Sequence, residues 1–259
     1  MTRARDECVP RRREDRAPNG VSSFSRFGLD CAHSRVASGY RVPDRGGFAA
    51  GPPTSDHDRG ASPVTPEVDG LDVVACEHCE RLCASRSRIV NGVGPADADL
   101  LFVGEAPGAN EDEAGEPFVG RSGDVLDDAL RAAGLDRADV RITNCVRCRP
   151  PDNRDPRADE LDNCRAFLDH EVDSVDPEVV VPLGKVPAEH LLGRDVAVTS
   201  EAGDVVEADI GETRRRVLIS VHPAATLYDR SQADTFEHTI GRAADFTDGE
   251  SGQARLGDF

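Results

Sequence analysis

The sequence predicts a three-layer α/β domain, and two observations support this. Three short apolar runs, beginning at Leu100, Val179 and Val217, lack the polar alternation of a half-exposed strand. They therefore suit strands that are buried on both faces. Between the runs lie segments with the 3.6-residue apolar period of a helix. Buried strands that alternate with helices are typical of a sheet covered by helices on both sides.

The chain is expected to divide into three parts. Residues 1–69 are rich in Arg, Gly, Pro, Ser and Asp and show no helical or strand period, so they are expected to form a disordered extension. A loose basic arm for nucleic acid is the alternative. The folded domain is expected over residues 70–247, and residues 248–259 are expected to form a flexible tail.

The first half of the domain is organised around one strand and its loop. Leu100 to Val103 forms the first expected strand and runs into the loop GEAPGANEDEAGEPFVG, whose glycines let the backbone approach a ligand closely. Ser122 to Ala133 has an apolar stripe, a serine available as a cap and Gly134 as a stop, which predicts a helix. Val140 to Val146 is the second expected strand.

The second half continues the alternation. Ala158 to Ser174 is helical in pattern, Val179 to Leu183 reads as the third strand, and Gly184 to Leu192 as a further helix. Val205 to Val217 predicts a polar hairpin that carries three arginines. Val217 to Val221 is expected to be the last buried strand, and it ends at a histidine.

The charge composition is unusual. The formal net charge is −18, and Lys185 is the one lysine among 31 basic residues. An acidic, lysine-poor composition resembles that of proteins from halophilic archaea; an ordinary acidic cytosolic protein is the alternative. At molar salt the Debye length falls to about 3 Å, so acidity argues only weakly against a nucleic-acid partner.

The expected location is the cytoplasm. No run approaches the roughly 18 consecutive apolar residues that a membrane span needs, and the amino terminus is too polar for a secretory signal. No membrane partner is therefore expected. In a reducing cytoplasm, eight cysteines are better explained by metal binding than by disulfides.

The cysteines form a distant and asymmetric set. A CxxC pair at Cys76 and Cys79 is separated by 68 residues from Cys148, and Cys164 follows after 15 more. Four thiolates can close a zinc site or hold an iron-sulfur cluster. The spacing favours a cluster that ties two loops together; structural zinc, or simply buried thiols, is the alternative.

Three strand ends carry polar side chains, Glu105 in GEAPG, Asn144 in ITN and His222 in SVHPAATL. With the motifs around them, namely VGEAPGANEDEAGEPFVG, CRPPDNR, VPLG and the HPA box, the chain from Leu71 to Phe246 resembles the family 4 uracil-DNA glycosylases. The resemblance implies an α/β/α sandwich with a central parallel sheet and a [4Fe-4S] cluster. It also implies hydrolysis of the N-glycosidic bond of uracil in DNA, which leaves an abasic site for base excision repair.

The resemblance assigns the ligands of the cluster. They fall on four cysteines, and Cys83 and Cys145 are then extra thiols. The alternative is that Cys83 replaces one of the four as a ligand. The expected ligands are Cys76, Cys79, Cys148 and Cys164.

The resemblance also assigns substrate contacts. A uracil must be extruded from the duplex into a pocket, where Phe118 is expected to stack on it and Asn144 to donate to O4 and accept from N3. Glu111 is expected to crowd the C5 position against a thymine methyl. Each residue has a structural alternative. Phe118 could pack in the core, Asn144 could bond to the backbone of a loop, and Glu111 could be a solvated carboxylate.

Two residues are expected to carry the chemistry. His222 is placed to stabilise charge on uracil O2 as the bond breaks, and Glu105, together with the backbone of Ala106, is expected to position the attacking water. A strand-end histidine that caps the following turn is the structural alternative. A non-catalytic iron-sulfur module that binds DNA is the second function considered, and a zinc nucleic-acid module is the third.

The tail carries a separate motif. In QARLGDF, the spacing of Gln253, Leu256 and Phe259 is that of a sliding-clamp-binding peptide, which presents one glutamine and two apolar anchors to a groove. The expected partners are uracil-containing DNA and a sliding clamp, and the protein is expected to be a monomer.

Overall fold

The structure, a computed structural model, describes residues 67–247. The clamp motif, with Gln253, Leu256 and Phe259, lies outside the described residues, as do residues 1–66. Within the part described, no helix is both long and apolar enough to cross a membrane. The elements in chain order are β1 (Glu67–Asp69), β2 (Asp72–Ala75), α1 (Glu80–Ser85), β3 (Leu100–Gly104), α2 (Ala109–Ala114), α3 (Arg121–Ala132), η1 (Arg137–Asp139), β4 (Arg141–Asn144), η2 (Pro151–Asn153), α4 (Ala158–Val175), β5 (Val179–Pro182), α5 (Lys185–Leu192), α6 (Val198–Glu201), β6 (Val205–Ile210), β7 (Thr213–Leu218), α7 (Pro223–Thr226) and α8 (Arg230–Ala244).

A five-stranded sheet forms the centre, with the strand order β4-β3-β5-β7-β6. Strands β4, β3, β5 and β7 are parallel, whereas β6 pairs antiparallel with β7 at the edge. The register places Phe102 of β3 beside Ile142 of β4 and Val181 of β5. The carboxyl ends of the parallel strands therefore meet at one edge of the sheet, where ligands bind in such folds.

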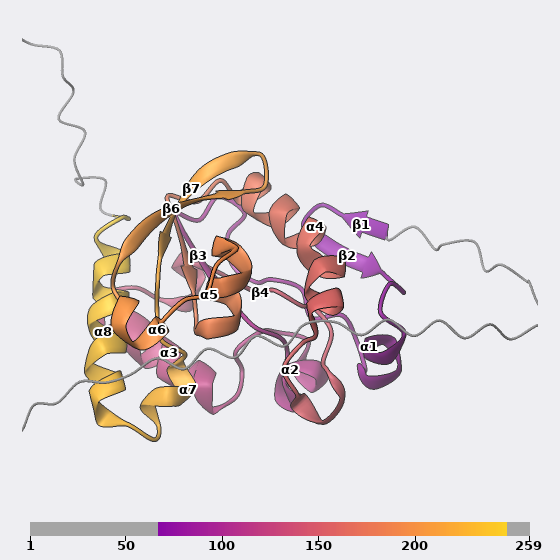
Figure 1. The fold of residues 1–259 in the computed structure, drawn as a ribbon, viewed down its shortest axis with the longest axis horizontal. Helices are drawn as coiled ribbons and strands as arrows, with labels where there is room; N and C mark the ends of the chain where they lie inside the picture. Colours follow the sequence, from indigo (N-terminus) through magenta and orange to yellow (C-terminus); the bar gives the residue numbers. More distant parts are fainter. Residues whose placement is uncertain (1–66, 248–259) are drawn as a thin grey trace, which may run out of the picture. The chain divides into compact units, whose positions relative to one another are not determined.

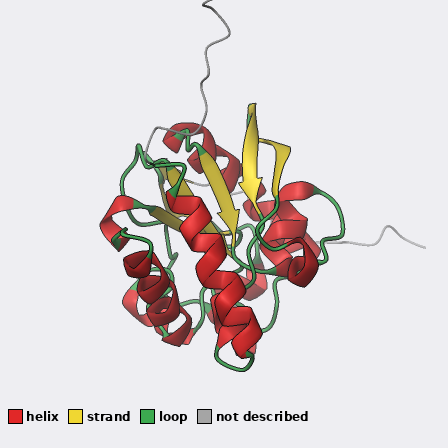
Figure 2. Ribbon diagram, turned by 90° about the vertical axis from the view of Figure 1, so that its left-hand side faces the viewer, coloured by secondary structure: helices red, strands yellow, loops and turns green. Residues whose placement is uncertain are grey.

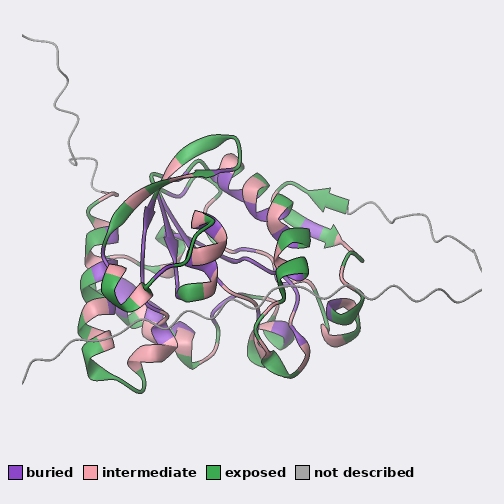
Figure 3. Ribbon diagram, in the orientation of Figure 1, coloured by how far each residue is buried: buried purple, intermediate pink, exposed green. Residues whose placement is uncertain are grey.

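Helices cover both faces of the sheet, as Figures 1 and 2 show. Successive side chains of a strand point to opposite faces, so Leu100 and Phe102 of β3 pack with helices α3 and α8. Leu101 and Val103 pack on the other face with helices α4 and α5. The central strands are buried along their lengths (Figure 3), which explains why their sequences are continuous apolar runs. The predicted three-layer fold is confirmed.

Some elements differ from the sequence prediction. The expected hairpin and the expected last buried strand share a single strand, β7, which pairs with β6 on one side and with β5 at Val217 on the other. Helix α3 begins after Gly120, so Ser122 is not its cap. The hairpin of β1 and β2 begins at Glu67, where an extension was expected.

Helix α8 was not predicted, although the sequence carries signals for it. Asp229 caps its first turn by accepting a hydrogen bond from the amide of Ser231 at 2.9 Å. A stripe with helical spacing faces the core, and its members are Phe236, Thr239, Ile240 and Ala243. This helix completes the layer that covers one face of the sheet beside α3.

Candidate functional site

A pocket of about 200 Å³ opens at the carboxyl edge of the sheet. Strands β3, β4 and β7 supply three of its walls, and the loops around α2 supply the rest. All six residues that the sequence predicted for catalysis and substrate binding line it. The lining residues are Glu105, Ala106, Gly108, Glu111, Phe118, Ser122, Asn144 and His222.

Gly104, the last residue of β3, makes this convergence possible. A Cβ atom at Gly104 would lie 2.3 Å from Oδ1 of Asn144 and 2.6 Å from Cε2 of Phe118. Both side chains therefore pack against bare backbone at the end of the strand, a close approach that only glycine permits.

Phe118 supplies the aromatic surface of the pocket. Its side chain is almost fully buried, with 6% exposed, and its ring centroid lies 6.1 Å from that of His222 with the planes inclined at 32°. The two rings therefore bound the pocket on adjacent sides, which suits a small planar ligand that stacks on one and bonds to the other.

Asn144 ends β4 and is 3% exposed. Among the residues that the structure describes, its side-chain amide makes no hydrogen bond, although it lines the pocket. Its donor and acceptor are therefore available to a ligand.

His222 presents a single donor to the pocket. Its Nδ1 accepts a hydrogen bond from the backbone amide of Ala224 at 3.0 Å at the start of α7. Burial lowers the pKa of His222, so the imidazole is neutral near pH 7. A neutral ring whose Nδ1 accepts must carry its proton on Nε2. His222 thus caps the following turn through Nδ1, as the structural alternative expected, and Nε2–H stays available to the pocket. Its expected role at uracil O2 remains a prediction.

Glu105 follows β3 directly. Burial, and secondarily the negative charge of Asp155, raise the pKa of Glu105 to about 7. Its backbone carbonyl accepts from the amide of Val146 at 3.1 Å, which extends the pairing of β3 and β4 past their ends. A carboxyl group poised near neutral pH in a pocket is a candidate general base.

Glu111 is bound by the loops on both sides of α2. Its Oε2 accepts from the amide of Gly108 at 3.0 Å, and its Oε1 accepts from Val119 at 3.2 Å and Gly120 at 3.1 Å. The carboxylate therefore ties the β3–α2 loop to the α2–α3 loop. Glu111 also lines the pocket. Its predicted position beside the C5 atom of a bound base remains a prediction.

The four cysteines predicted as metal ligands gather beside this pocket. They belong to one cluster of side chains, to which Ala106 of the pocket also belongs. Arg86 Nη1 donates to Sγ of Cys148 at 2.8 Å, and Asn163 Nδ2 donates to Sγ of Cys79 at 3.4 Å. Within residues 67–247, no three His, Cys, Asp or Glu side chains are arranged to hold a metal ion. The clustered cysteines are Cys76, Cys79, Cys148 and Cys164.

The two extra thiols lie in different surroundings. Cys145 is buried in the core between the sheet and α4, where burial strongly raises its pKa. Cys83 lies one turn beyond Cys79 on α1, and its Sγ lies 3.6 Å from the carbonyl of Cys76. Cys145 is therefore an apolar core residue, whereas Cys83 is near the predicted ligands.

Arg147 was missed by the sequence analysis. It is buried between the strand end and the cysteines, and Nη2 pairs with Glu171 Oε2 at 2.7 Å. Its Nη1 donates to Asn91 Oδ1 at 3.0 Å, and Glu171 also pairs with Arg141 at 2.8 Å. These partners lie 24 to 56 residues away in sequence from Arg147, so no local pattern indicates them.

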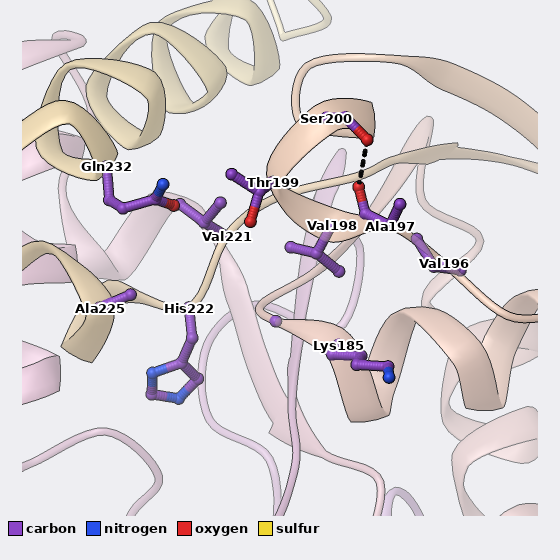
Figure 4. A pocket seen from close by; sticks show the side chains of 11 residues that line it. Lys185, Val196, Ala197, Val198, Thr199, Ser200, Val221, His222, Ala225 and Gln232 are labelled. Atoms are coloured by element: carbon purple, nitrogen blue, oxygen red, sulfur yellow. Dashed lines mark hydrogen bonds between the residues drawn. The ribbon is translucent and has the colours of Figure 1, made fainter. Parts of the chain in front are cut away.

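A second cavity, of about 530 Å³, shares His222 with the pocket. Figure 4 shows Lys185 at the start of α5, Val198 and Thr199 of α6, and Gln232 of α8 around it. It opens at the carboxyl ends of β5 and β7, on the same edge of the sheet as the smaller pocket.

The fold and the pocket define an α/β protein with a small pocket at the carboxyl edge of its sheet. Residues 91–246 match the uracil DNA glycosylase superfamily, and the chain belongs to this family. The type-4 uracil-DNA glycosylase of Archaeoglobus fulgidus is 36% identical over 170 residues, which cover 64% of this chain and 85% of the relative.

Two further type-4 uracil-DNA glycosylases are similar. That of Sulfurisphaera tokodaii is 39% identical over 163 residues, covering 61% of this chain and 74% of the relative. That of Thermotoga maritima is 38% identical over 166 residues, covering 64% and 84%. The similarity thus extends over most of each relative, and the family match spans the residues of the pocket.

Proposed function

We propose that the protein is a uracil-DNA glycosylase, which hydrolyses the N-glycosidic bond of uracil in DNA and leaves an abasic site. The observation that carries the proposal is the convergence of Glu105, Phe118, Asn144 and His222 in one pocket of about 200 Å³, in a chain of the uracil DNA glycosylase superfamily. A base inside a duplex cannot reach such a pocket, so the nucleotide is extruded before reaction.

The buried side chains of Phe118 and Asn144 recognise the base. The extruded uracil stacks on Phe118, and the Asn144 amide donates to O4 and accepts from N3–H. Cytosine presents the opposite pattern, with a donor at C4 and an acceptor at N3, so it leaves the amide unsatisfied. Glu111, at the edge of the pocket, crowds the C5 position, where thymine carries a methyl group.

Bond cleavage develops negative charge on the uracil ring. The Nε2–H of His222 donates to O2, and its neutral state makes this a hydrogen bond from an already oriented donor. A preorganised donor of this kind is worth about 3–4 kcal/mol of barrier. Glu105 and the backbone of Ala106 orient the attacking water, and the deprotonated carboxylate accepts its proton.

We further propose that Cys76, Cys79, Cys148 and Cys164 hold a [4Fe-4S] cluster. Four thiol donors from segments far apart in sequence suit this group, and two of them accept N–H···S hydrogen bonds of the kind that surround iron-sulfur ligands. Bound there, the cluster supplies a rigid cross-link between loops. Ala106 packs against the same side chains, so this cross-link supports the pocket.

DNA contacts extend along the segment that follows His222. Leu227 and Tyr228 follow α7 and are exposed, Tyr228 to 87%, which suits a wedge that fills the space left by the extruded base. Arg149 and Arg154 are further candidates for phosphate contact. Arg154 already forms a two-pronged pair with Glu160, at 2.6 and 2.7 Å, so its first role is to fix the loop before α4.

The surface and the tail support three finer proposals. The net charge of −18 with one lysine supports a haloarchaeal type of enzyme that folds and acts in the cytoplasm at molar salt. The protein acts as a monomer. The tail motif, with Gln253, Leu256 and Phe259, binds a sliding clamp; pull-down of the clamp by the full chain tests this, and retention by Phe259→Ala would reject it.

The function is tested by incubating the protein with a uracil-containing oligonucleotide at high salt, followed by alkaline cleavage of abasic sites. We expect strand scission with the wild type, loss of scission with His222→Ala, and no loss with His238→Ala, an exposed histidine on α8. Binding of the oligonucleotide without scission would favour the non-catalytic DNA-binding module. Iron and sulfide analysis separates the cluster from zinc.

A further inference from the structure

The loop from Pro117 to Gly120 carries the aromatic surface of the pocket in an unusual conformation. Phe118 has a φ of +55°, in the left-handed region that a bulky side chain rarely adopts. Such a conformation persists only where the surrounding structure holds it in place. What holds Phe118 therefore also sets the direction of its ring.

Arg137, from η1, binds this loop through its carbonyl groups. Its Nη1 donates to the carbonyl of Phe118 at 3.1 Å, and its Nη2 donates to the carbonyl of Pro117. The same Nη1 lies 2.9 Å from Oδ1 of Asp127 on α3, and both side chains are largely covered. A planar guanidinium that is fixed by a carboxylate can hold two adjacent carbonyls in one orientation.

The neighbouring helix leaves room for this arrangement. A Cβ atom at Gly123 would lie 1.8 Å from the carbonyl oxygen of Phe118, so the carbonyl passes directly over the first turn of α3. The carbonyl can take this path only because residue 123 is glycine.

The second half of the loop, Val119 and Gly120, is held by a carboxylate instead of a guanidinium. The Glu111 carboxylate accepts from the amides of Val119 and Gly120, at 3.2 and 3.1 Å. The Arg137 guanidinium therefore binds the carbonyls of the first two residues of the loop, and the Glu111 carboxylate binds the amides of the last two. Glu111 lines the pocket, whereas Arg137 does not.

We propose that Arg137 is a positioning residue that fixes the ring of Phe118 against Gly104 and His222 by holding the carbonyls of Pro117 and Phe118. This inference rests on the proposed function for its effect on activity. Arg137 does not line the pocket itself but contacts the backbone of Phe118, so it acts through the orientation of Phe118. Without the guanidinium, the peptide after Phe118 loses the hydrogen bond to its carbonyl and keeps only the bond from the Val119 amide to Glu111. The ring can then leave the plane in which uracil stacks.

The test compares Arg137→Met with a matched control, Arg131→Met. Methionine keeps an apolar chain of similar length but donates no hydrogen bond. Arg131 lies on α3 and is exposed; its pair is with Asp128 at 2.7 Å. Because small misplacements of a contact group can lower rates by up to about 100-fold, we expect Arg137→Met to lower kcat for uracil release about 10–100-fold. We expect KM for DNA to change little and Arg131→Met to match the wild type.

A double-mutant cycle separates positioning from a general loss of stability. In a Phe118→Ala background, Arg137→Met should cause less than about a twofold further loss, because the group through which it acts is absent. Equal losses in the two backgrounds would overturn the proposal. If Arg137→Met does not fold, Arg137→Lys, which keeps the charge beside Asp127 but loses the two-pronged geometry, replaces it in the same cycle.

Hydrogen exchange supplies a readout that does not depend on activity. We expect the amides of residues 118–120 to exchange faster in Arg137→Met than in Arg131→Met. If the wild type releases no uracil but the amides exchange faster in Arg137→Met, the proposed function is rejected and the positioning role of Arg137 is retained. An active wild type, with unchanged exchange and unchanged kcat in Arg137→Met, would reject the positioning role and retain the function.

Discussion

The pKa of Glu105 leads to a prediction about the pH dependence of uracil release. Burial and the charge of Asp155 raise this pKa from 4.5 to about 7. The deprotonated carboxylate is the form that accepts a proton from water, so kcat should rise with pH through about 7 and level off above it. Burial lowers the pKa of His222, so that residue is neutral at pH 7 and above, where the profile levels off.

Glu105→Gln tests this directly. A positioned general base typically contributes about 10²–10⁴-fold, so kcat should fall by that factor and the rising limb should disappear. The assay is single-turnover uracil release between about pH 5 and 9, read by alkaline cleavage of abasic sites. A flat profile in the wild type, or a rising limb that persists in Glu105→Gln, would refute the role of Glu105.

Asp155 supplies a graded variant. It is the second cause of the raised pKa, after burial, so Asp155→Asn should move the midpoint of the limb below about 7 without returning it to 4.5. Asp152→Asn, in the same loop, is the matched control and should leave the midpoint in place. If both variants share the wild-type midpoint, the charge of Asp155 does not act on Glu105.

The raised pKa of Glu105 also predicts that Glu105→Gln is more stable than the wild type above pH 7. Glu105 holds its proton more tightly in the folded protein than in the unfolded chain, so wild-type stability should fall as pH rises from 4.5 to about 7 and change no further above. At about 1.4 kcal/mol per pH unit this interval is worth at most about 3.5 kcal/mol, which solvent contact reduces to about 1–2 kcal/mol. Glu105→Gln should therefore melt roughly 2–8 °C above the wild type at pH 8, and the difference should vanish near pH 4.5.

Three further variants test other parts of the site. Asn144→Asp removes the donor to uracil O4, so the ratio of uracil to cytosine release should fall by about 10³-fold or more in paired oligonucleotide assays; an unchanged ratio would contradict its role. Gly104→Ala puts a methyl group 2.6 Å from the Phe118 ring, and we expect kcat to fall about 10–100-fold, whereas wild-type kinetics would show that the ring does not rest there. Arg86→Met removes the donor to Cys148, so iron should be lost to a chelator about tenfold faster, as followed by visible absorbance; an equal rate would place Arg86 outside the surroundings of the cluster.

Local patterns predicted the layers but not the exact elements of the fold. Leu100 to Val103 and Val179 to Pro182 are apolar without alternation, which marked them as strands covered on both faces, and they are buried. The last strand was divided wrongly because Thr213–Leu218 combines a polar, hairpin half with a buried, parallel half. Its role depends on two different neighbours, and a one-dimensional pattern does not show which neighbour lies beside each half.

The sequence by itself determined which chemical groups the site contains. Glu105, Asn144 and His222 each lie at the end of a strand that the sequence predicts, and parallel strands bring their carboxyl ends to one edge, so their meeting follows from the strand pattern. The catalytic and binding roles of these residues stay predictions, as do the four cluster ligands.

Tertiary structure alone decided the state and orientation of those groups. The tautomer of His222 depends on the Ala224 amide, and the pKa of Glu105 depends on burial and on Asp155. The orientation of Phe118 depends on Arg137, 19 residues away in sequence. Hydrogen bonds, desolvation and charge act over a few ångströms in space whatever the separation along the chain. Residue types can therefore be read from the sequence, whereas the partners that tune them appear only once the chain is folded.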